Sequence, residues 1–413
     1  MNDNRRLRIA LLTYRGNPHS GGQGIYVRYL SKALIDAGHS VEVFAGQPYP
    51  ELDEGVKLTK LDSLDLYRSD DPFRRPARSE FGDWMDVLEY GLMCTAGFPE
   101  PLTFSLRAAR AIEARRDEFD VVHDNQSLGY GLLQLGRHLP VVATIHHPCS
   151  LDRKLEVGHA PDWKKRASLR RWYGFTKMQG RVARRLPHLV SVSETAKQDV
   201  VSEFGVDAGR VAVVPNGVDV EVFRPLSDVP RKPGRIVTTA SADVPLKGLV
   251  YLIEALAKIR TERPADLVVV GKARPNGMVA EAINHFGLNT SVRFETGIDS
   301  SRIVQLYAEA EVAVVPSLYE GFSLPAIEAM ACRVPLVATR AGAIPEVVGD
   351  AAVLVPPRDA EALAVAIKDL LDDKTRRVEM GADGRRHVLT NFTWAAAAER
   401  TVDVYERALL AHR

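Results

Sequence analysis

The sequence has little of several features that mark other classes of protein. Its 413 residues include three cysteines, far apart and without metal-ligand spacing, so we expect reduced thiols in a cytoplasmic setting: Cys94, Cys149 and Cys332. No hydrophobic run approaches the roughly 20 residues of a membrane-spanning helix. The formal net charge is +1, which argues against a nucleic-acid partner because such proteins carry a basic excess.

The chain also contains no Asp-x-Asp pair, a pair that often holds a metal ion on a diphosphate. No histidine stands at metal-ligand spacing from a carboxylate or thiol. We therefore expect neither a metal nor a cofactor, and positive charge at a diphosphate would have to come from lysine and backbone amides. The residues carry no signal of an oligomeric state.

What the sequence does contain is an alternation of strand-like and helix-like segments through both halves, typical of parallel sheets with crossover helices. At 413 residues two domains are expected. We predict an α/β fold of two doubly wound, Rossmann-like domains facing a cleft, residues 1–222 and 223–393, with a Pro-rich linker at 223–234. The predicted strands are 8–13, 41–45, 120–123, 141–145, 189–192 and 211–214, then 236–239, 267–270, 292–295, 312–315 and 336–338.

Two glutamates, Glu320 and Glu328, flank a predicted junction between the strand 312–315 and a helix beginning near Leu324. Between them lies a loop whose N–H groups can face a phosphate: those of Phe322, Ser323 and Leu324. One acid can then reach a sugar and the other a ribose, with the diphosphate between them. A sugar-nucleotide site is the leading hypothesis for this segment.

A candidate phosphate-binding feature follows the first predicted strand of each half: a glycine-rich loop in the first half and Lys247 in the second. Lys247 lies at the predicted start of a helix running to about Arg260, where its charge and the helix N-terminus both favour a diphosphate. The loop around Gly22 lacks the spacing of the dinucleotide fingerprint. Its place at a strand's carboxyl end favours a position in the cleft.

Three histidines end two predicted strands of the first half: His123, His146 and His147. A lone histidine is usually a hydrogen-bonded structural residue, and we favour that interpretation for His123 and His147. His146 is better placed for a substrate.

Two segments interrupt the regular pattern. The insertion 65–101 either shapes substrate access or packs on its own domain. The stretch 163–186 has nine cations and no acid, interleaved with aromatic residues. It is either a solvated helix face or a peripheral contact with anionic lipid on the cytoplasmic side of a membrane.

These motifs together resemble the family 4 retaining glycosyltransferases, which have the GT-B architecture. The resemblance covers nearly the whole chain and is carried by Gly21-Gly22, 214–219, the Glu-x7-Glu segment 320–328, 335–339, 342–346 and 392–394. It implies that Glu320 contacts donor-sugar hydroxyls, Glu328 the ribose and Lys247 the diphosphate. It also implies that Gly22 lines the cleft, that His146 serves the sugar's reacting face, and that helix 394–413 crosses back onto the first domain.

The sequence departs from the family pattern at two positions. Where the family usually has a donor-binding arginine, this chain has Ser241, and we expect Lys272 or Arg274 to supply the missing charge. Arg333 replaces a customary glycine.

The resemblance implies retaining transfer of a hexosyl group to a saccharide acceptor. GDP-mannose is the expected donor, as in actinobacterial α-mannosyltransferases that elongate methylmannose polysaccharide. Alternatives are a UDP-glucose-dependent enzyme and a phosphatidylinositol-type mannosyltransferase. A sugar-nucleotide epimerase and a non-catalytic sugar-nucleotide binder are rivals from other classes.

Overall fold

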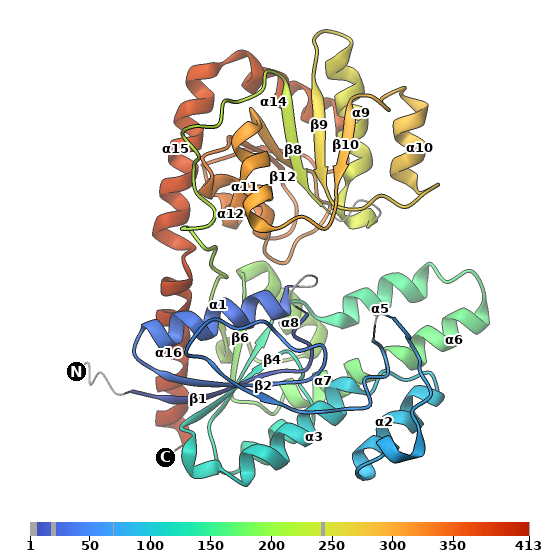
Figure 1. Ribbon diagram of the computed structural model, residues 1–413, viewed down its shortest axis with the longest axis vertical. Coiled ribbons are helices and arrows are strands. Elements are labelled where there is room, and N and C mark those ends of the chain that lie inside the picture. Colours follow the sequence, from blue (N-terminus) through green and yellow to red (C-terminus); the bar gives the residue numbers. More distant parts are fainter. Residues whose placement is uncertain (1–5, 18–21, 69, 241–243, 413) are drawn as a thin grey trace. The chain divides into compact units, whose positions relative to one another are not determined.

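The computed structural model describes residues 6–17, 22–68, 70–240 and 244–412. The chain divides into two compact units: unit 1 comprises residues 1–214 with 397–413, and unit 2 comprises residues 215–396. Each unit has its own parallel β-sheet with helices packed against it (Figure 1).

The chain passes between the units at Val214, ahead of the boundary and linker that we placed from the sequence. The segment 223–234 is hydrogen bonded into unit 2 rather than spanning between units. Lys232 N donates to Glu309 O at 2.8 Å, and Gly234 N donates to Glu311 Oε2 at 2.7 Å. The Pro-rich, charged composition of 223–234 therefore belongs to a surface segment of unit 2 and not to a linker between the units.

The sheet of unit 1 has the strand order β3-β2-β1-β4-β5-β6-β7. The order reverses between β1 and β4, which creates the crevice where doubly wound sheets bind ligands. The strands are β1 (Arg8–Thr13), β2 (Ser40–Ala45), β3 (Lys57–Lys60), β4 (Val121–Asn125), β5 (Val141–Ile145), β6 (His188–Ser191) and β7 (Val211–Val213).

The helices of unit 1 include long amphipathic segments that bury one apolar face against this sheet. They are α1 (Gln23–Asp36), α2 (Trp84–Cys94), α3 (Glu100–Glu113), α4 (Gly131–Leu135), α5 (Cys149–Gly158), α6 (Trp163–Trp172), α7 (Phe175–Ala183) and α8 (Glu194–Phe204). Most of the last helix, α16 (Trp394–His412), also belongs to unit 1. There Tyr405 OH lies 2.6 Å from Nδ1 of the buried His123, which is thereby a structural residue.

Unit 2 repeats the same topology with the order β10-β9-β8-β11-β12-β13. Its strands are β8 (Arg235–Thr239), β9 (Asp266–Val270), β10 (Val292–Glu295), β11 (Val312–Val315), β12 (Leu336–Thr339) and β13 (Val353–Val355). Its helices are α9 (Leu249–Arg260), α10 (Met278–His285), α11 (Ser300–Glu309), α12 (Leu324–Ala331), α13 (Ile344–Val348), α14 (Ala360–Asp372) and α15 (Lys374–Asn391). The α9 helix packs against α10 and α14, and α12 packs against α15.

The predicted strands are confirmed to within two residues at each end, and two further strands were not predicted. These are β3 and β13, which lie at sheet edges; the side chains of β3 are half-buried or exposed, and those of β13 are half-buried except for the buried Val355. β3 lacks the continuous apolar run that predicts a buried strand, and the apolar β13 has only three residues.

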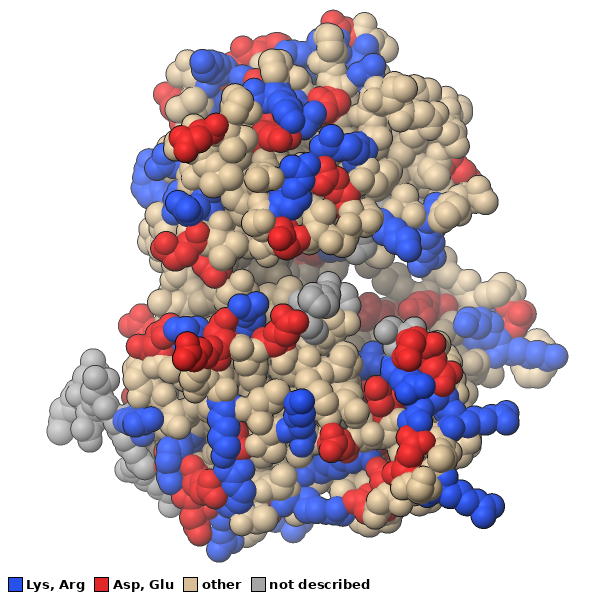
Figure 2. Space-filling model, in the orientation of Figure 1, with Lys and Arg blue, Asp and Glu red and all other residues tan. Residues whose placement is uncertain are grey.

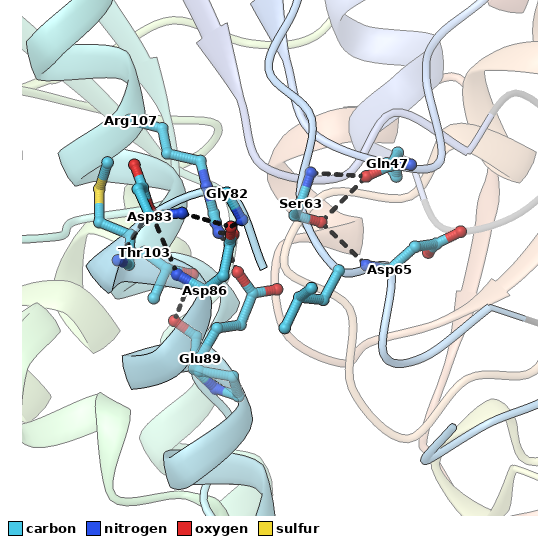
Figure 3. Close-up of polar contacts among 12 residues, drawn as sticks. Gln47, Ser63, Asp65, Gly82, Asp83, Asp86, Glu89, Thr103 and Arg107 are labelled. Atoms are coloured by element: carbon cyan, nitrogen blue, oxygen red, sulfur yellow. Dashed lines mark hydrogen bonds and ion pairs between the residues drawn. The ribbon is translucent and has the colours of Figure 1, made fainter. Parts of the chain in front are cut away.

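The insertion 65–101 packs on its own unit (Figure 3). Arg107 on α3 donates through Nη2 to Asp86 Oδ1 on α2 at 2.6 Å, and its Nη1 lies 2.5 Å from Glu89 Oε2. All three side chains are buried or nearly so. At the start of the insertion, Asp65 N donates to Ser63 Oγ at 3.2 Å, and that hydroxyl donates to Gln47 Oε1 at 3.0 Å.

The basic stretch 163–186 divides into two helices with different surroundings. Along α6 every side chain except those of Leu169 and Trp172 is exposed, and Trp163 is 73% exposed. In contrast, α7 contributes Met178, Val182 and Ala183 to the core. On the face shown in Figure 2, cations and acids are interspersed over both units. None of the helices in the described ranges is long and apolar enough to span a bilayer.

Candidate active site

Lys247 and Glu320 meet at the point in unit 2 where the strand order reverses. Lys247 follows β8 and Glu320 follows β11; these strands are parallel neighbours, and the strands that come next in the chain, β9 and β12, lie on opposite sides of the pair. Lys247 Nζ donates to Glu320 Oε1 at 2.8 Å. Both side chains retain some exposure, 29% for Lys247 and 12% for Glu320, so a ligand can reach them.

Lys247 is held by a tight turn and not by a helix, which corrects the expected position. It ends a 3₁₀ turn, and Gly248, with a φ of 64°, separates it from α9. Gly248 is required here because a Cβ would lie 2.0 Å from Pro316 O. Leu318 N also donates to Leu246 O at 2.7 Å, so the segments after β8 and β11 are fixed to each other.

Glu320 is oriented by two further hydrogen bonds. Its Oε1 accepts a hydrogen bond from Ser317 Oγ at 2.7 Å, and its backbone O accepts from Ala343 N at 2.9 Å. Gly342 has a φ of 54°, and a Cβ there would lie 2.3 Å from Glu320 O. The glycine therefore permits the loop after β12 to pack directly on the backbone of Glu320.

The second acid, Glu328, lies on α12 in a half-buried position. Burial raises the pKa of this carboxyl group from 4.5 to about 7. Its charge in turn contributes to the raised pKa of the buried Tyr307, which burial dominates. A carboxylate that lacks solvation in this way is stabilised by any ligand that donates hydrogen bonds to it.

The loop between the two acids adopts an unusual backbone conformation. Ser323 has φ 118° and ψ 76°, and it immediately precedes Leu324, the first residue of α12. Phe322 is buried, and its ring packs edge-to-face on Phe392 with the centroids 5.8 Å apart. The helix begins where the sequence predicted it.

The expected additional cations lie on the loop after β9. Ala240 N donates to Val270 O at 3.1 Å, which places the start of this loop beside the segment that leads to Lys247. Lys272 and Arg274 on it are both exposed. Ser241, which stands where the family usually has a donor-binding arginine, lies outside the described residues, so nothing tests whether it binds the donor.

In unit 1, His146 is held at the carboxyl end of β5 by Asn125 and Gln126. His146 Nε2 lies 2.7 Å from Asn125 Oδ1, and His146 N donates to Gln126 Oε1 at 2.6 Å. Asn125 Nδ2 donates to Gln23 O at 3.3 Å, which directs Oδ1 toward the imidazole. Gly22 lies at the beginning of α1 next to Gln23, with φ 29°.

The proton on His146 is therefore assigned to Nε2. A carbonyl oxygen can only accept, so Nε2 must donate to Asn125, and Nδ1 is left as an acceptor. Burial lowers the pKa of His146 to about 4, which keeps the ring neutral at pH 7. A neutral ring with an open Nδ1 can accept a hydrogen bond from a hydroxyl group.

Two matches to family models cover the two units in turn. Residues 20–222 match the model described as Glycosyltransferase Family 4, and residues 233–373 match that of Glycosyl transferases group 1. An MMP alpha-(1->4)-mannosyltransferase of Mycolicibacterium hassiacum is 50% identical over 408 residues, covering 98% of each chain. The chain belongs to glycosyltransferase family 4.

Other relatives of this family 4 glycosyltransferase are more distant. A D-inositol 3-phosphate glycosyltransferase of Kineococcus radiotolerans is 28% identical, with 97% of this chain and 95% of the relative covered. Among solved structures, the sucrose-phosphate synthase from Thermosynechococcus elongatus superimposes with a TM-score of 0.72 at 25% identity, covering 98% and 100% of the two chains. The predicted GT-B fold and enzyme class are confirmed.

Three site residues of the family 4 glycosyltransferase were not selected from its sequence: Asn125, Gln126 and Ser317. Asn125 ends β4 and Gln126 follows it, at the same sheet edge as His146. Ser317 lies between β11 and Glu320, so its position was available as a signal. These side chains carry neither a charge nor an aromatic ring, so their residue types alone do not indicate a functional site.

Within the described ranges, no group of three or more His, Cys, Asp or Glu side chains is arranged to hold a metal ion. His147, which neighbours His146, has its Nε2 3.1 Å from Asp152 Oδ1. Asp152 lies in the first turn of α5. The charged groups of the unit 2 site are instead one lysine and two glutamates.

Proposed function

We propose that this family 4 glycosyltransferase moves a mannosyl group from GDP-mannose to a hydroxyl of a saccharide acceptor, with retention at the anomeric carbon. The observation that carries the proposal is the Lys247–Glu320–Ser317 cluster at the switch point of unit 2, which pairs one cation with one sugar-binding acid. The choice of mannose is supported by the relative that is 50% identical and is named as a mannosyltransferase.

In the proposed complex the donor binds unit 2. The ammonium group of Lys247 binds the diphosphate, together with the N–H groups of Phe322, Ser323 and Leu324 at the start of α12. Glu320 accepts hydrogen bonds from sugar hydroxyls, and Glu328 accepts them from the ribose. Each acid thereby exchanges an incompletely solvated state for directed hydrogen bonds.

The chemical step breaks the bond between the anomeric carbon and the diphosphate oxygen and forms a bond from the same carbon to the acceptor oxygen. The acceptor proton passes to the departing phosphate oxygen on the same face, and GDP leaves. Charge grows on the diphosphate and on the sugar ring as the bond breaks. Lys247 stabilises the transition state, in which negative charge develops on the diphosphate, more than it stabilises the ground state, and so it lowers the barrier.

We assign the acceptor and the sugar's reacting face to unit 1. His146 carries this role because its neutral ring offers Nδ1 to a sugar hydroxyl while Asn125 holds Nε2. Gly22 contributes backbone rather than a side chain near the start of α1. No cofactor or metal is part of the proposal, since Lys247 and the peptide amides supply the positive charge.

Two alternatives differ in donor or acceptor. A UDP-glucose donor would use the same unit 2 residues, because none of them selects a base. A phosphatidylinositol-type acceptor is favoured by one observation, the exposed cations and Trp163 along α6. Flotation with vesicles containing phosphatidylinositol tests this second alternative, and a membrane-bound acceptor predicts that the protein moves with the vesicles.

The deciding experiment is transfer itself. The full chain is incubated in EDTA with GDP-mannose, UDP-glucose and other nucleotide sugars, with and without mannose oligosaccharides. We expect GDP release that depends on the acceptor, and an oligosaccharide longer by one α-linked mannose in mass and NMR spectra. Release from another donor, or a requirement for divalent metal, would contradict the proposal.

A further inference from the structure

Ser323 combines two unfavourable features that a structural role does not explain. Its φ of 118° lies in a region that favours glycine, so a serine there strains the backbone. Its side chain is also buried, at 3% exposure, and its Oγ has no hydrogen-bond partner among the described residues. Buried polar atoms are normally paired, and an unpaired one indicates a missing partner.

Ser323 also fails to act as a helix cap, the usual role of a serine before a helix. At the start of α8, Ser193 Oγ accepts a hydrogen bond from Ala196 N at 2.9 Å. Ser323 stands at the equivalent position of α12, yet its side chain caps no N–H group. The Ser323 hydroxyl therefore remains available to donate a hydrogen bond to another group.

The first turn of α12 is short of donors for an anion. Pro325 has no N–H group, and the N–H groups of Ala326 and Ile327 already bond to Ser323 O at 3.2 and 3.5 Å. A hydroxyl at Ser323 adds a donor at the helix end that attracts negative charge. Ser317, in comparison, is already committed to Glu320.

We propose that Ser323 Oγ donates a hydrogen bond to a phosphate oxygen of the bound nucleoside diphosphate. The inference rests on the proposed function and adds a side-chain contact to the backbone contacts of the loop. Ser323 is then a donor-binding residue whose buried hydroxyl gains a hydrogen-bond partner when the diphosphate is present.

A second strained residue provides a matched control. Arg333 follows the other end of α12 with a φ of 56°, and its side chain is exposed. Replacing Arg333 by glycine relieves backbone strain in the same helix without removing any group proposed to meet the donor. Comparison of the two ends separates strain relief from loss of the hydroxyl.

The test is calorimetric titration of GDP and guanosine into the wild-type full chain, Ser323→Gly, Ser323→Ala and Arg333→Gly, with thermal unfolding of each free protein. We expect both Ser323 variants to bind GDP about tenfold more weakly, the size of a lost hydrogen bond to a charged group. Their affinity for guanosine should be unchanged. Ser323→Gly should also unfold at a higher temperature, and Arg333→Gly should do so while keeping wild-type GDP affinity.

The possible failures are distinguishable. If the wild-type protein binds GDP but both Ser323 variants bind it equally well, this inference is wrong and the proposed function stands. An equal loss for guanosine and GDP would place the contact on the nucleoside and overturn the phosphate assignment. If the wild-type chain binds no nucleoside diphosphate at all, both proposals fail.

Discussion

Lys247 Nζ and Glu320 Oε1 lie 2.8 Å apart although 73 residues separate them in the chain. In the free protein, Lys247, which we propose binds the diphosphate, is thus paired with Glu320, which we propose binds the sugar. On this proposal, a bound diphosphate would compete with Glu320 for Lys247 and leave the carboxylate available to the sugar hydroxyls.

Glu320→Gln should abolish most transfer without unfolding the protein. Glutamine cannot balance Lys247 and is a weaker acceptor for sugar hydroxyls, so we expect kcat to fall by roughly 100-fold or more. The thermal midpoint should change by little, because a partly exposed ion pair contributes about 1 kcal/mol or less. Initial rates of GDP release and circular dichroism provide the two measurements.

Ser317→Ala is the graded control for this variant, because it removes one hydrogen bond to Glu320 and keeps both charges. We expect a loss of about tenfold in kcat. Full activity of Glu320→Gln, or a larger loss for Ser317→Ala, would be inconsistent with the role given to the carboxylate.

Donor affinity should rise with pH through the titration of Glu328. Burial raises its pKa to about 7, and only the carboxylate can accept both ribose hydrogen bonds. Donor binding therefore lowers this pKa and expels a proton from the fraction of molecules that carry one. Below pH 7 the affinity should fall by up to about tenfold per pH unit, and above it the affinity should level off.

The measurement is calorimetry with GDP-mannose between pH 5.5 and 8.5, since its diphosphate has no ionisation in this range. His146 does not interfere, because burial lowers its pKa to about 4 and keeps it neutral throughout this range. Glu328→Gln should bind the donor more weakly than wild type at pH 8 and show no dependence on pH. Unchanged pH dependence in that variant would assign the titration to another group.

Arg107→Met should destabilise unit 1 strongly. Arg107 is 9% exposed and forms contacts to both Asp86 and Glu89, so its loss leaves two buried acids without a cation. The expected loss is about 3–5 kcal/mol in free energy of unfolding. Denaturant titration measures it, with the triple variant Arg107→Met, Asp86→Asn, Glu89→Gln as control.

The triple variant should recover much of the lost stability, because no unpaired charge remains buried. A single variant as stable as wild type would show that the Arg107 network does not hold the insertion onto α3.

Arg333→Gly should raise stability, since Arg333 occupies a left-handed conformation just after α12, where glycine is favoured. Its carbonyl accepts from Arg231 Nη2 at 2.8 Å, so the backbone is held in this conformation whatever the side chain. We expect a gain of about 0.5–1 kcal/mol. Arg333→Ala keeps the strained backbone and should give no gain in thermal unfolding; an equal gain would attribute the effect to the lost charge.

The buried strands and the acid pair could be predicted because they leave local signals. The run at 312–315 is continuously apolar, the run at 141–145 is interrupted only by Thr144, and Glu320 and Glu328 flank a strand-to-helix junction. The edge strand β3 lacks such a run, β13 has only three residues, and both depend on pairing with a neighbour. Their existence is a tertiary property.

Side-chain partners in the site were less predictable for a related reason. The contact between Lys247 and Glu320 depends on the order β8-β11 in the sheet, which no local pattern specifies. The tight turn at Gly248 follows from the approach of Pro316, which is equally distant in sequence. Arg333, which the sequence left unexplained, is accounted for by its backbone conformation.

The most direct test of the central claim is calorimetric titration of GDP in EDTA into the wild-type chain and Lys247→Ala. We expect the wild-type chain to bind GDP without any divalent ion. We expect Lys247→Ala, with an unchanged thermal midpoint, to bind roughly 100-fold more weakly because a charge-assisted hydrogen bond to the diphosphate is lost. Equal affinity of the two proteins, or binding that requires a divalent ion, would contradict this claim.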